Sequence, residues 1–288
     1  MTPTMPTTTS KPTELAEWQV EFGGVVLLGP GTRIPIGEIE GLGAPDVRPQ
    51  DVDNPVADGT LPGIDLYGPR TVRIEAGIKT PGDPRAAADH LARLQRAARA
   101  ENVRTRTGKL SVLRARWPGH STRRLYGRIR RMEATSTASA VHGWIPLDIE
   151  FVAMDPLFHA DTESSLPLPL DQADRPGRII NDGDAAAWPT LRIEGPVSGP
   201  KIWNAVTGQT LELDVTLRTG EYVEIATRPG TRWVLRNGRT NAAGALTPAS
   251  RLDRFTIPPG PSELAWSGTD PTATSRLTVS WRSAYNTL

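Results

Sequence analysis

The stretch from Ile145 to His159, IPLDIEFVAMDPLFH, constrains the fold more than any other part of the chain. Its apolar residues alternate with Asp148 and Glu150, which is the period of a β-strand with one buried face. The Asp155-Pro156 pair then ends the strand, because proline has no amide hydrogen to donate and restricts the residue before it.

The composition changes after this strand. Residues 160–178 combine prolines with Asp, Ser and Leu and show little periodicity, as expected of a linker. A chain of 288 residues is long enough for two domains with a core each. We therefore expect a disordered tail at 1–16, an N-terminal domain at 17–159, a linker at 160–178 and a C-terminal domain at 179–288.

The N-terminal half has strand patterns and one helix pattern. WQVEFGGVVLL predicts a strand pair broken at Gly23-Gly24, and the alternation from Arg70 to Ile78 predicts a longer strand. PRAAADHLARLQRAARAE is rich in helix formers, with Asp83 placed to cap the helix and Pro84 in its first turn. We expect a mainly β, sandwich-like domain in which this helix covers a sheet.

Residues Lys109 to Glu133 predict a long β-hairpin that turns at Pro118-Gly119. Side chains two residues apart on a strand share a face, so the hairpin has an arginine face and an apolar face. Two interpretations remain open: a solvated edge ribbon whose charges prevent aggregation, or a binding surface. The arginine face would present Arg114, Arg116, Arg124, Arg128 and Arg130, and the apolar face includes Leu113, Trp117 and Ile129.

The net charge of +1 conceals an asymmetry along the chain. Residues 85–131 contain fourteen Lys or Arg and two acidic residues, whereas the segment from Gly41 to Tyr67, which we expect to be a loop, carries five aspartates and one arginine. A basic cluster can bind nucleic acid through phosphate charge. Because the interleaved aromatic residues of a single-strand binder and the common DNA-binding motifs are missing, we expect no specific nucleic-acid partner.

The C-terminal half is a series of short strand patterns at close spacing, which predicts an antiparallel β-sandwich. Two interpretations of its tryptophans remain open. They are core residues of the strands, or they are platforms on which sugar rings stack, as aromatic faces pack on apolar sugar faces. The residues concerned are Trp188, Trp203, Trp233, Trp266 and Trp281.

Enzyme signatures are missing from the sequence. The chain has no cysteine, which excludes disulfides, thiolate metal sites and a cysteine nucleophile. The four histidines are scattered, and GxSxG, P-loop and GxGxxG motifs do not occur. No apolar run is long enough to span a membrane. We expect no catalytic residues, no metal and no cofactor.

Several segments together resemble the distal tail proteins of siphophages. In the first half these are WQVEFGGVVLL, IGEIEGLGAPDVR, GPRTVRIEAGI and FVAMDPLFH. In the second half, NDGDAAAWPTLRIEGP and RLTVSWRSAY resemble the C-terminal sandwich of that family, which is often described as galectin-like. The likeness covers nearly the whole chain after about Glu17 and rests on the order of these segments rather than on one motif.

The resemblance implies a structural virion protein that is assembled in the host cytoplasm. It implies a homohexameric ring at the distal end of the tail tube, formed by residues 17–159, which connects the tail tube protein to the tail-tip hub protein. The alternative is a carbohydrate- or receptor-binding module that recognises a host-surface glycan through the C-terminal sandwich. The resemblance supplies no catalytic or contact residues.

A cyclic ring joins two different surfaces of each subunit, and the charge pattern offers such a pair. We expect the arginine face of the hairpin to contact the acidic loop of a neighbouring subunit, with Trp117 adding apolar contact area. Pairing of the two within one subunit is the alternative. The interface candidates are Arg114, Arg116, Arg124, Arg128, Arg130, Trp117, Asp46, Asp51, Asp53 and Asp58.

Overall fold

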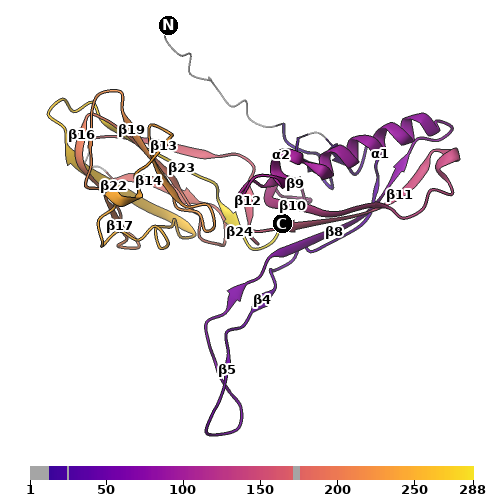
Figure 1. Cartoon of the computed structure of the whole chain (residues 1–288), viewed down its shortest axis with the longest axis horizontal. Coiled ribbons are helices and arrows are strands. Elements are labelled where there is room, and N and C mark those ends of the chain that lie inside the picture. Colours follow the sequence, from indigo (N-terminus) through magenta and orange to yellow (C-terminus); the bar gives the residue numbers. More distant parts are fainter. Residues whose placement is uncertain (1–12, 25, 171–175) are drawn as a thin grey trace.

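The computed structural model describes residues 13–24, 26–170 and 176–288. Two β-rich halves lie one after the other along the long axis, and a thin arm projects from the first half, away from that axis (Figure 1). The mainly β architecture with a helix on one sheet, expected from the sequence, is confirmed.

One antiparallel sheet organises the first half. The strand pair broken at Gly23-Gly24, the hairpin and the long strand ending at Ala153 are all confirmed as parts of it. Short strand β12 (Phe158–Ala160) continues the sheet from β10. The strand order is β2 (Val26–Leu28), β1 (Val20–Phe22), β9 (Ser111–Ala115), β10 (Arg123–Ala134), β11 (Trp144–Ala153), β8 (Arg70–Lys79) and β3 (Ile36–Glu40).

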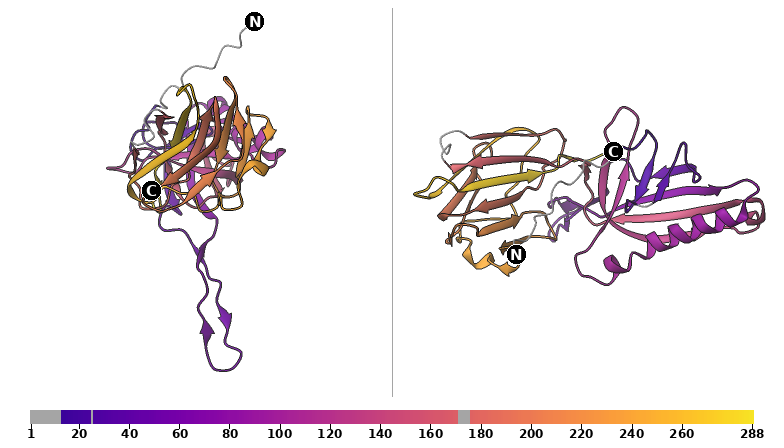
Figure 2. Two further views of the ribbon diagram at one scale, coloured as in Figure 1. Left: turned by 90° about the vertical axis from the view of Figure 1, so that its left-hand side faces the viewer. Right: turned by 90° about the horizontal axis from the view of Figure 1, so that it is seen from above.

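Helix α1 (Pro84–Arg99) covers the inner face of β8, β10 and β11, as Figures 1 and 2 show. The Asp83 side chain accepts a hydrogen bond from the amide of Ala86 at 2.9 Å, and Pro84 opens the helix, as expected from the sequence. Ala87 and Leu94 are buried against the sheet, so the core of this half lies between sheet and helix. A short helix α2 (Glu101–Arg104) follows, and the turn η1 (Ala140–His142) precedes β11.

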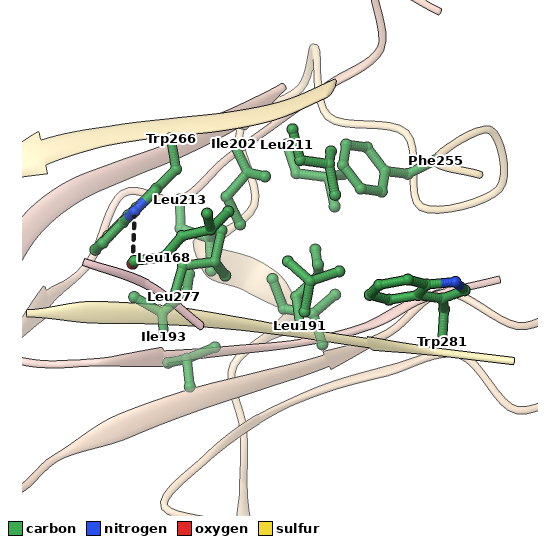
Figure 3. Close-up of a cluster of buried hydrophobic side chains, with 14 of the residues drawn as sticks. Leu168, Leu191, Ile193, Ile202, Leu211, Leu213, Phe255, Trp266, Leu277 and Trp281 are labelled. Atoms are coloured by element: carbon green, nitrogen blue, oxygen red, sulfur yellow. Dashed lines mark hydrogen bonds between the residues drawn. The ribbon is translucent and has the colours of Figure 1, made fainter. Parts of the chain in front are cut away.

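The second half is a sandwich of two antiparallel sheets. Their facing side chains form one apolar core, which includes Trp266 and Trp281 (Figure 3). The first sheet has the order β13 (Ser164–Pro169), β23 (Arg276–Trp281), β15 (Thr190–Glu194), β19 (Tyr222–Ala226), β20 (Trp233–Arg236) and β21 (Thr240–Asn241). The second has β14 (Gly177–Asn181), β22 (Gly260–Thr269), β16 (Val197–Asn204), β17 (Thr210–Glu212) and β18 (Thr216–Leu217), and the turn η3 (Ala243–Ala245) lies outside both.

The structure differs from the expected linker and tail. Part of the linker, Ser164–Pro169, is strand β13, whose prolines are tolerated because β13 is an edge strand and its outer side needs no amide donors. Residues 171–175 of the linker and 1–12 of the tail lie outside the described residues. Residues 13–16 pack on the hairpin, where Leu15 is buried and its amide donates to Thr122 Oγ1 at 3.1 Å.

The end of the chain returns to the first half. Strand β24 (Ala284–Tyr285) pairs with β12, and the amide of Leu288 donates to the carbonyl of Leu42 at 3.2 Å. The side chain of Leu288 is buried in the core of the first half. The two halves are therefore tied at both ends of the second one, and the domain boundaries stay a prediction.

Candidate interaction surface

The segment expected to be an acidic loop is a projecting two-stranded arm. Between Gly41 and Gly68 the chain runs out and back, with β4 (Val47–Arg48) paired to β7 (Leu66–Tyr67) and β5 (Val52–Asp53) paired to β6 (Thr60–Leu61). Figure 1 and the left view of Figure 2 both show the arm projecting away from the body. The arm is long because its backbone is extended. The Asp and Pro content of the segment predicted a loop and gave no indication of this extended form.

Large apolar side chains of the arm are exposed. Val56 keeps 91% of its surface exposed and Ile64 keeps 76%. Isolated apolar residues are common on protein surfaces, but such a series on one thin projection indicates a surface that another molecule covers. The others are Val47, Val52, Leu61, Leu66 and Tyr67.

The candidate aspartates are exposed on the same arm. Asp51 has a local role, because its Oδ1 accepts a hydrogen bond from the amide of Gly63 at 2.9 Å and so holds the two strands together. Gly63 is needed there, since a Cβ would lie 2.0 Å from the carbonyl oxygen of Gln50. The exposed set comprises Asp46, Asp51, Asp53 and Asp58.

A buried arginine fixes the base of the arm. Arg70 donates to the carbonyl oxygens of Gly41, Gly43, Pro156 and Asn286, which come from the arm, the end of β11 and the C-terminal segment. Burial lowers the pKa of Arg70, and the charge of nearby Asp46 acts in the opposite direction. The base of the arm is thus held rigidly, while its tip is free of the body.

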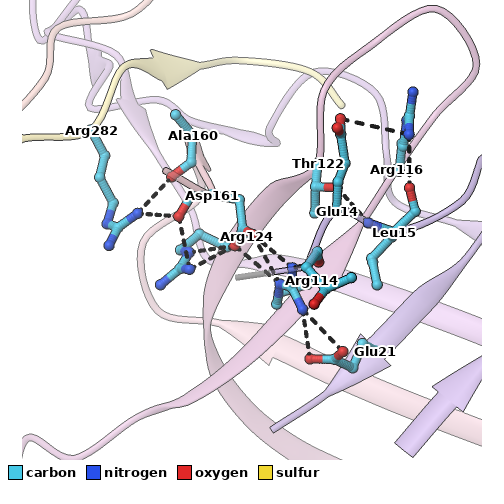
Figure 4. A network of polar contacts seen from close by, with 11 residues as sticks. Glu14, Leu15, Glu21, Arg114, Arg116, Thr122, Arg124, Ala160, Asp161 and Arg282 are labelled. Atoms are coloured by element: carbon cyan, nitrogen blue, oxygen red, sulfur yellow. Dashed lines mark hydrogen bonds and ion pairs between the residues drawn. The ribbon is translucent and has the colours of Figure 1, made fainter. Parts of the chain in front are cut away.

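The arginine face of the hairpin is not a free basic surface. Arg114 is buried and binds both Asp161 and Glu21, with Nη2 2.7 Å from Asp161 Oδ2 and Nη1 3.0 Å from Glu21 (Figure 4). Burial lowers the pKa of Arg114, but hydrogen bonds to the two carboxylates outweigh this effect and raise it. Arg124 shares Asp161 at 2.6 Å. These two arginines serve internal packing.

The remaining arginines also have local partners. Arg116 donates to the carbonyl of Leu15 at 2.8 Å, and Arg128 donates to the carbonyls of Val103 in helix α2 and of Lys109 after it. Arg130 is exposed, because a β-bulge between Ile129 and Arg131 places it outside the alternation. Arg130 nevertheless lines the same hollow as Arg128, and its place on one interface with Arg124 and Arg128 stays a prediction.

The arginines and the aspartates do not meet within the chain. Across the described ranges, no ion pair joins an arm aspartate to a hairpin arginine. Pairing within one subunit, the alternative considered from the sequence, is not found there. Instead Trp117 packs edge-on against Trp18, with ring centroids 4.2 Å apart, above an apolar hollow of about 290 Å³ that Leu42 and Leu288 also line.

A polar cluster that no sequence pattern indicated joins the two halves. Arg228 of the second half donates to Asp155 Oδ2 from Nη2 at 2.7 Å and lies over the ring of Tyr126. His159 Nε2 lies 2.9 Å from Asp155 Oδ2 and 3.0 Å from Arg228 Nη2. The sequence indicated that a strand ends at Asp155-Pro156. It did not indicate that Asp155 binds Arg228, which lies 73 residues further along the chain.

Burial and charge act on this cluster in opposite directions. Burial lowers the pKa of His159, although the hydrogen bond with Asp155 counteracts it. Burial would raise the pKa of Asp155, but His159 and Arg228 outweigh burial and hold that pKa well below its usual range. The cluster therefore contains a neutral imidazole beside a compensated Asp–Arg pair at neutral pH.

The described residues contain no group of three metal-ligating side chains. Within those same ranges, no helix has the length and apolar character needed to cross a membrane.

Comparison with known proteins agrees with the resemblance drawn from the sequence. Residues 182–285 match the family model "Siphovirus-type tail component, C-terminal domain". No curated protein sequence matches the chain.

Solved structures share the fold over nearly the whole chain. The crystal structure of the Dit protein (gp 19.1) of phage SPP1, described as a paradigm of the hub adsorption apparatus in phages infecting Gram-positive bacteria, has a TM-score of 0.61 at 13% identity and covers 93% of this chain and 99% of its own. Two structures of the phage P2 baseplate in its activated conformation also match at 8% identity. The one with Ca has a TM-score of 0.51 and covers 87% and 91%, and the one with Sr has 0.53 and covers 92% and 97%.

Proposed function

We propose that this chain, a structural tail component of the siphovirus type with the fold of the distal tail proteins, forms a homohexameric ring that joins a phage tail tube to the tail-tip hub. The family match over residues 182–285 and the shared fold support a non-enzymatic component of the virion tail tip. The number of copies and the two partners, the tail tube protein and the hub protein, are the proposal.

The projecting arm is the main structural support for this proposal. It leaves the body at a base fixed by Arg70 and presents apolar side chains that none of the described residues covers. An apolar projection on a rigid base suits insertion between subunits, because little ordering entropy is lost on association. A second copy is the natural occupant, since a cyclic ring needs one surface of each subunit to complement a different surface of the next.

The apolar hollow beside Trp18 and Trp117 is the complementary surface in this proposal. Its lining comes from the body and includes Val20, Ala115 and Leu288, so it offers contact area of the same apolar kind. Because Arg114 and Arg124 are already paired, the electrostatic part of the interface rests on the exposed Arg130 and the arm aspartates. Exposed ion pairs add about 0–1 kcal/mol each, so apolar contacts must supply most of the affinity.

Native mass spectrometry of the purified protein tests the ring. We expect a species of six chains of 31.2 kDa each. The double variant Val56→Asp with Ile64→Asp should give monomers with an unchanged circular dichroism spectrum, because both side chains are exposed in the single chain. The control is Val141→Asp, since Val141 is 67% exposed on the body. A hexamer that survives the double variant at physiological salt would rule out the arm as the interface.

A further inference from the structure

A hollow of about 230 Å³ lies between the two halves of the molecule and is lined by aromatic, hydroxyl and charged side chains. Tyr126 and His159 contribute to it from the first half, and the outer face of the β13–β21 sheet forms its floor. Sites for drug-sized ligands are about 300–1,000 Å³, so this hollow fits a group of the size of one sugar ring.

The floor is a row of small and hydroxyl side chains that crosses neighbouring strands. Ser280 of β23 lies opposite Thr190 of β15, Thr190 opposite Ala226 of β19, and Ala226 opposite Trp233 of β20. These residues share the outer face, because the residues next to them, such as Leu191 and Val279, point into the sandwich core. The row leaves hydroxyl groups on the floor and ends in an aromatic ring.

Tryptophan rings flank this floor. Trp233 is 36% exposed, and Trp188 is half-buried beside it. Neither ring belongs to the apolar core of the sandwich, whereas Trp266 and Trp281 do. A large aromatic ring that is kept partly exposed at the edge of a hollow is well suited to pack on the apolar face of a sugar.

Charge in the hollow favours an acidic sugar. The guanidinium of Arg228 is neutralised by Asp155. Among the described residues, by contrast, no carboxylate oxygen lies within hydrogen-bond distance of Arg282: its ion-pair partner Glu163 has Oε1 3.9 Å from Nε, and the charge of Asp161 acts from further away. Arg282 Nη1 donates to the carbonyls of Ala160 and Asp161. Within the described residues its Nε and Nη2 make no hydrogen bond, although the side chain is only 20% exposed. These two groups can bind a carboxylate or phosphate through paired N–H donors.

We propose that this hollow binds an acidic monosaccharide unit, with Trp233 and Trp188 stacking on the ring, Thr190 and Ser280 binding its hydroxyl groups, and Arg282 binding its anionic group. The proposal goes beyond ring formation and does not depend on it. An exposed acidic sugar on a bacterial surface polymer and a free sugar share this chemistry.

Titration of the full-length protein by saturation-transfer NMR tests the proposal. The probes are glucuronate and glucose 6-phosphate, with glucose and acetate as comparisons for the ring and the charge alone. We expect saturable binding of an acidic sugar with a Kd near 1 mM, equivalent to about 4 kcal/mol, and weaker binding of both comparisons. Loss of saturable binding of both acidic sugars at about 10 mM would overturn the proposal. If acetate binds as tightly as the acidic sugars, the hollow is a simple anion site and the proposal is wrong.

Two variants and one control locate the binding. Trp233→Ala should weaken the sugar Kd by about tenfold, as truncation of a contact residue does. Thr190→Val removes one hydroxyl at constant shape and should also weaken it. Trp144→Ala is the control, because Trp144 is 40% exposed on the first half and lines a different hollow. Equal affinities for Trp233→Ala and the unsubstituted protein, with both folded by circular dichroism, would contradict the assignment. The mass of the oligomer reports separately on the ring.

Discussion

Arg114 and Asp161 form a buried ion pair, with Nη2 2.7 Å from Oδ2, that joins strand β9 to the segment following β12. Arg124 uses the same carboxylate, and Glu21 supplies a second negative charge to Arg114. The basic hairpin is therefore built around internal carboxylates. This arrangement explains how arginines can lie at low exposure in adjacent strands without mutual repulsion.

Removal of the shared carboxylate should destabilise the protein. In Asp161→Asn, two guanidinium groups of low exposure lose their common counter-charge, and we expect a loss of about 3–5 kcal/mol in the free energy of unfolding. Urea denaturation measures it. The control is Glu133→Gln, whose partner Arg131 is exposed, and which should leave the midpoint unchanged. A midpoint of Asp161→Asn equal to that of the control would show that water replaces the pair.

Truncation of a core tryptophan should be similarly costly. Trp281 is 7% exposed, and its Nε1 donates to the carbonyl of Ile180 at 3.0 Å. Trp281→Ala should lower the free energy of unfolding by about 3–5 kcal/mol, because it leaves a cavity in the sandwich. Trp233→Ala serves as the matched control and should change it by about 0.5 kcal/mol or less. Similar losses for both would mean that Trp233 is as well packed as Trp281.

A glycine should be required where the C-terminal strand returns. A Cβ on Gly183 would lie 1.7 Å from the carbonyl oxygen of Ala284, so Gly183→Ala must displace β24 from β12. Hydrogen exchange at the amide of Ala160, which donates to the carbonyl of Ser283 at 2.8 Å, should then become faster. Gly244→Ala is the control, since a Cβ there meets no atom within 4 Å. Unchanged exchange at Ala160 would show that the strand accommodates the methyl group.

The inter-half cluster should make stability depend on pH. Burial lowers the pKa of His159, so below about pH 6.5 the unfolded chain binds a proton that the folded chain does not. The free energy of unfolding therefore decreases as the pH is lowered through this range. The pKa of Asp155 is also lowered, so its contribution is present above about pH 4 and is lost as the pH falls further.

Urea denaturation at about pH 7.5 and about pH 5.5 separates the two contributions, because only His159 acts in this window. His159→Gln should reduce the difference between the two midpoints. His120→Gln, in the exposed turn of the hairpin, should retain it. If His159→Gln keeps the full difference, the pH dependence originates elsewhere.

A fragment experiment tests the boundary of the second half. Strand β13 pairs with β23, and the carbonyl of Leu168 accepts the hydrogen bond of Trp266 Nε1 at 3.0 Å. A fragment that starts at Glu163 should therefore unfold at a higher urea concentration than one that starts at Ile179, which leaves that donor and part of the core exposed. Equal midpoints would support the boundary at 179 that the composition suggested.

The amino-acid sequence by itself determined the local elements and the fold class. The sequence predicted the alternation in β8 and β11, the Asp83 cap of α1 and the closely spaced strands of the second half. These features could be predicted because strand and helix periods are set by the backbone and by neighbouring residues. The order of weak motifs was also sufficient to indicate the resemblance with which the family match over residues 182–285 and the shared fold agree.

Tertiary structure alone decided where the charged and apolar groups of the candidate surfaces lie. The partner of Arg114 is 47 residues away, and the partner of Asp155 is 73 residues away, at distances in the chain where no sequence period operates. The bulge at Arg130 interrupts the regular pairing of β10 with β11, and the C-terminal Leu288 packs in the first half. An alternating pattern states which residues share a face, but the neighbouring strands decide what that face meets.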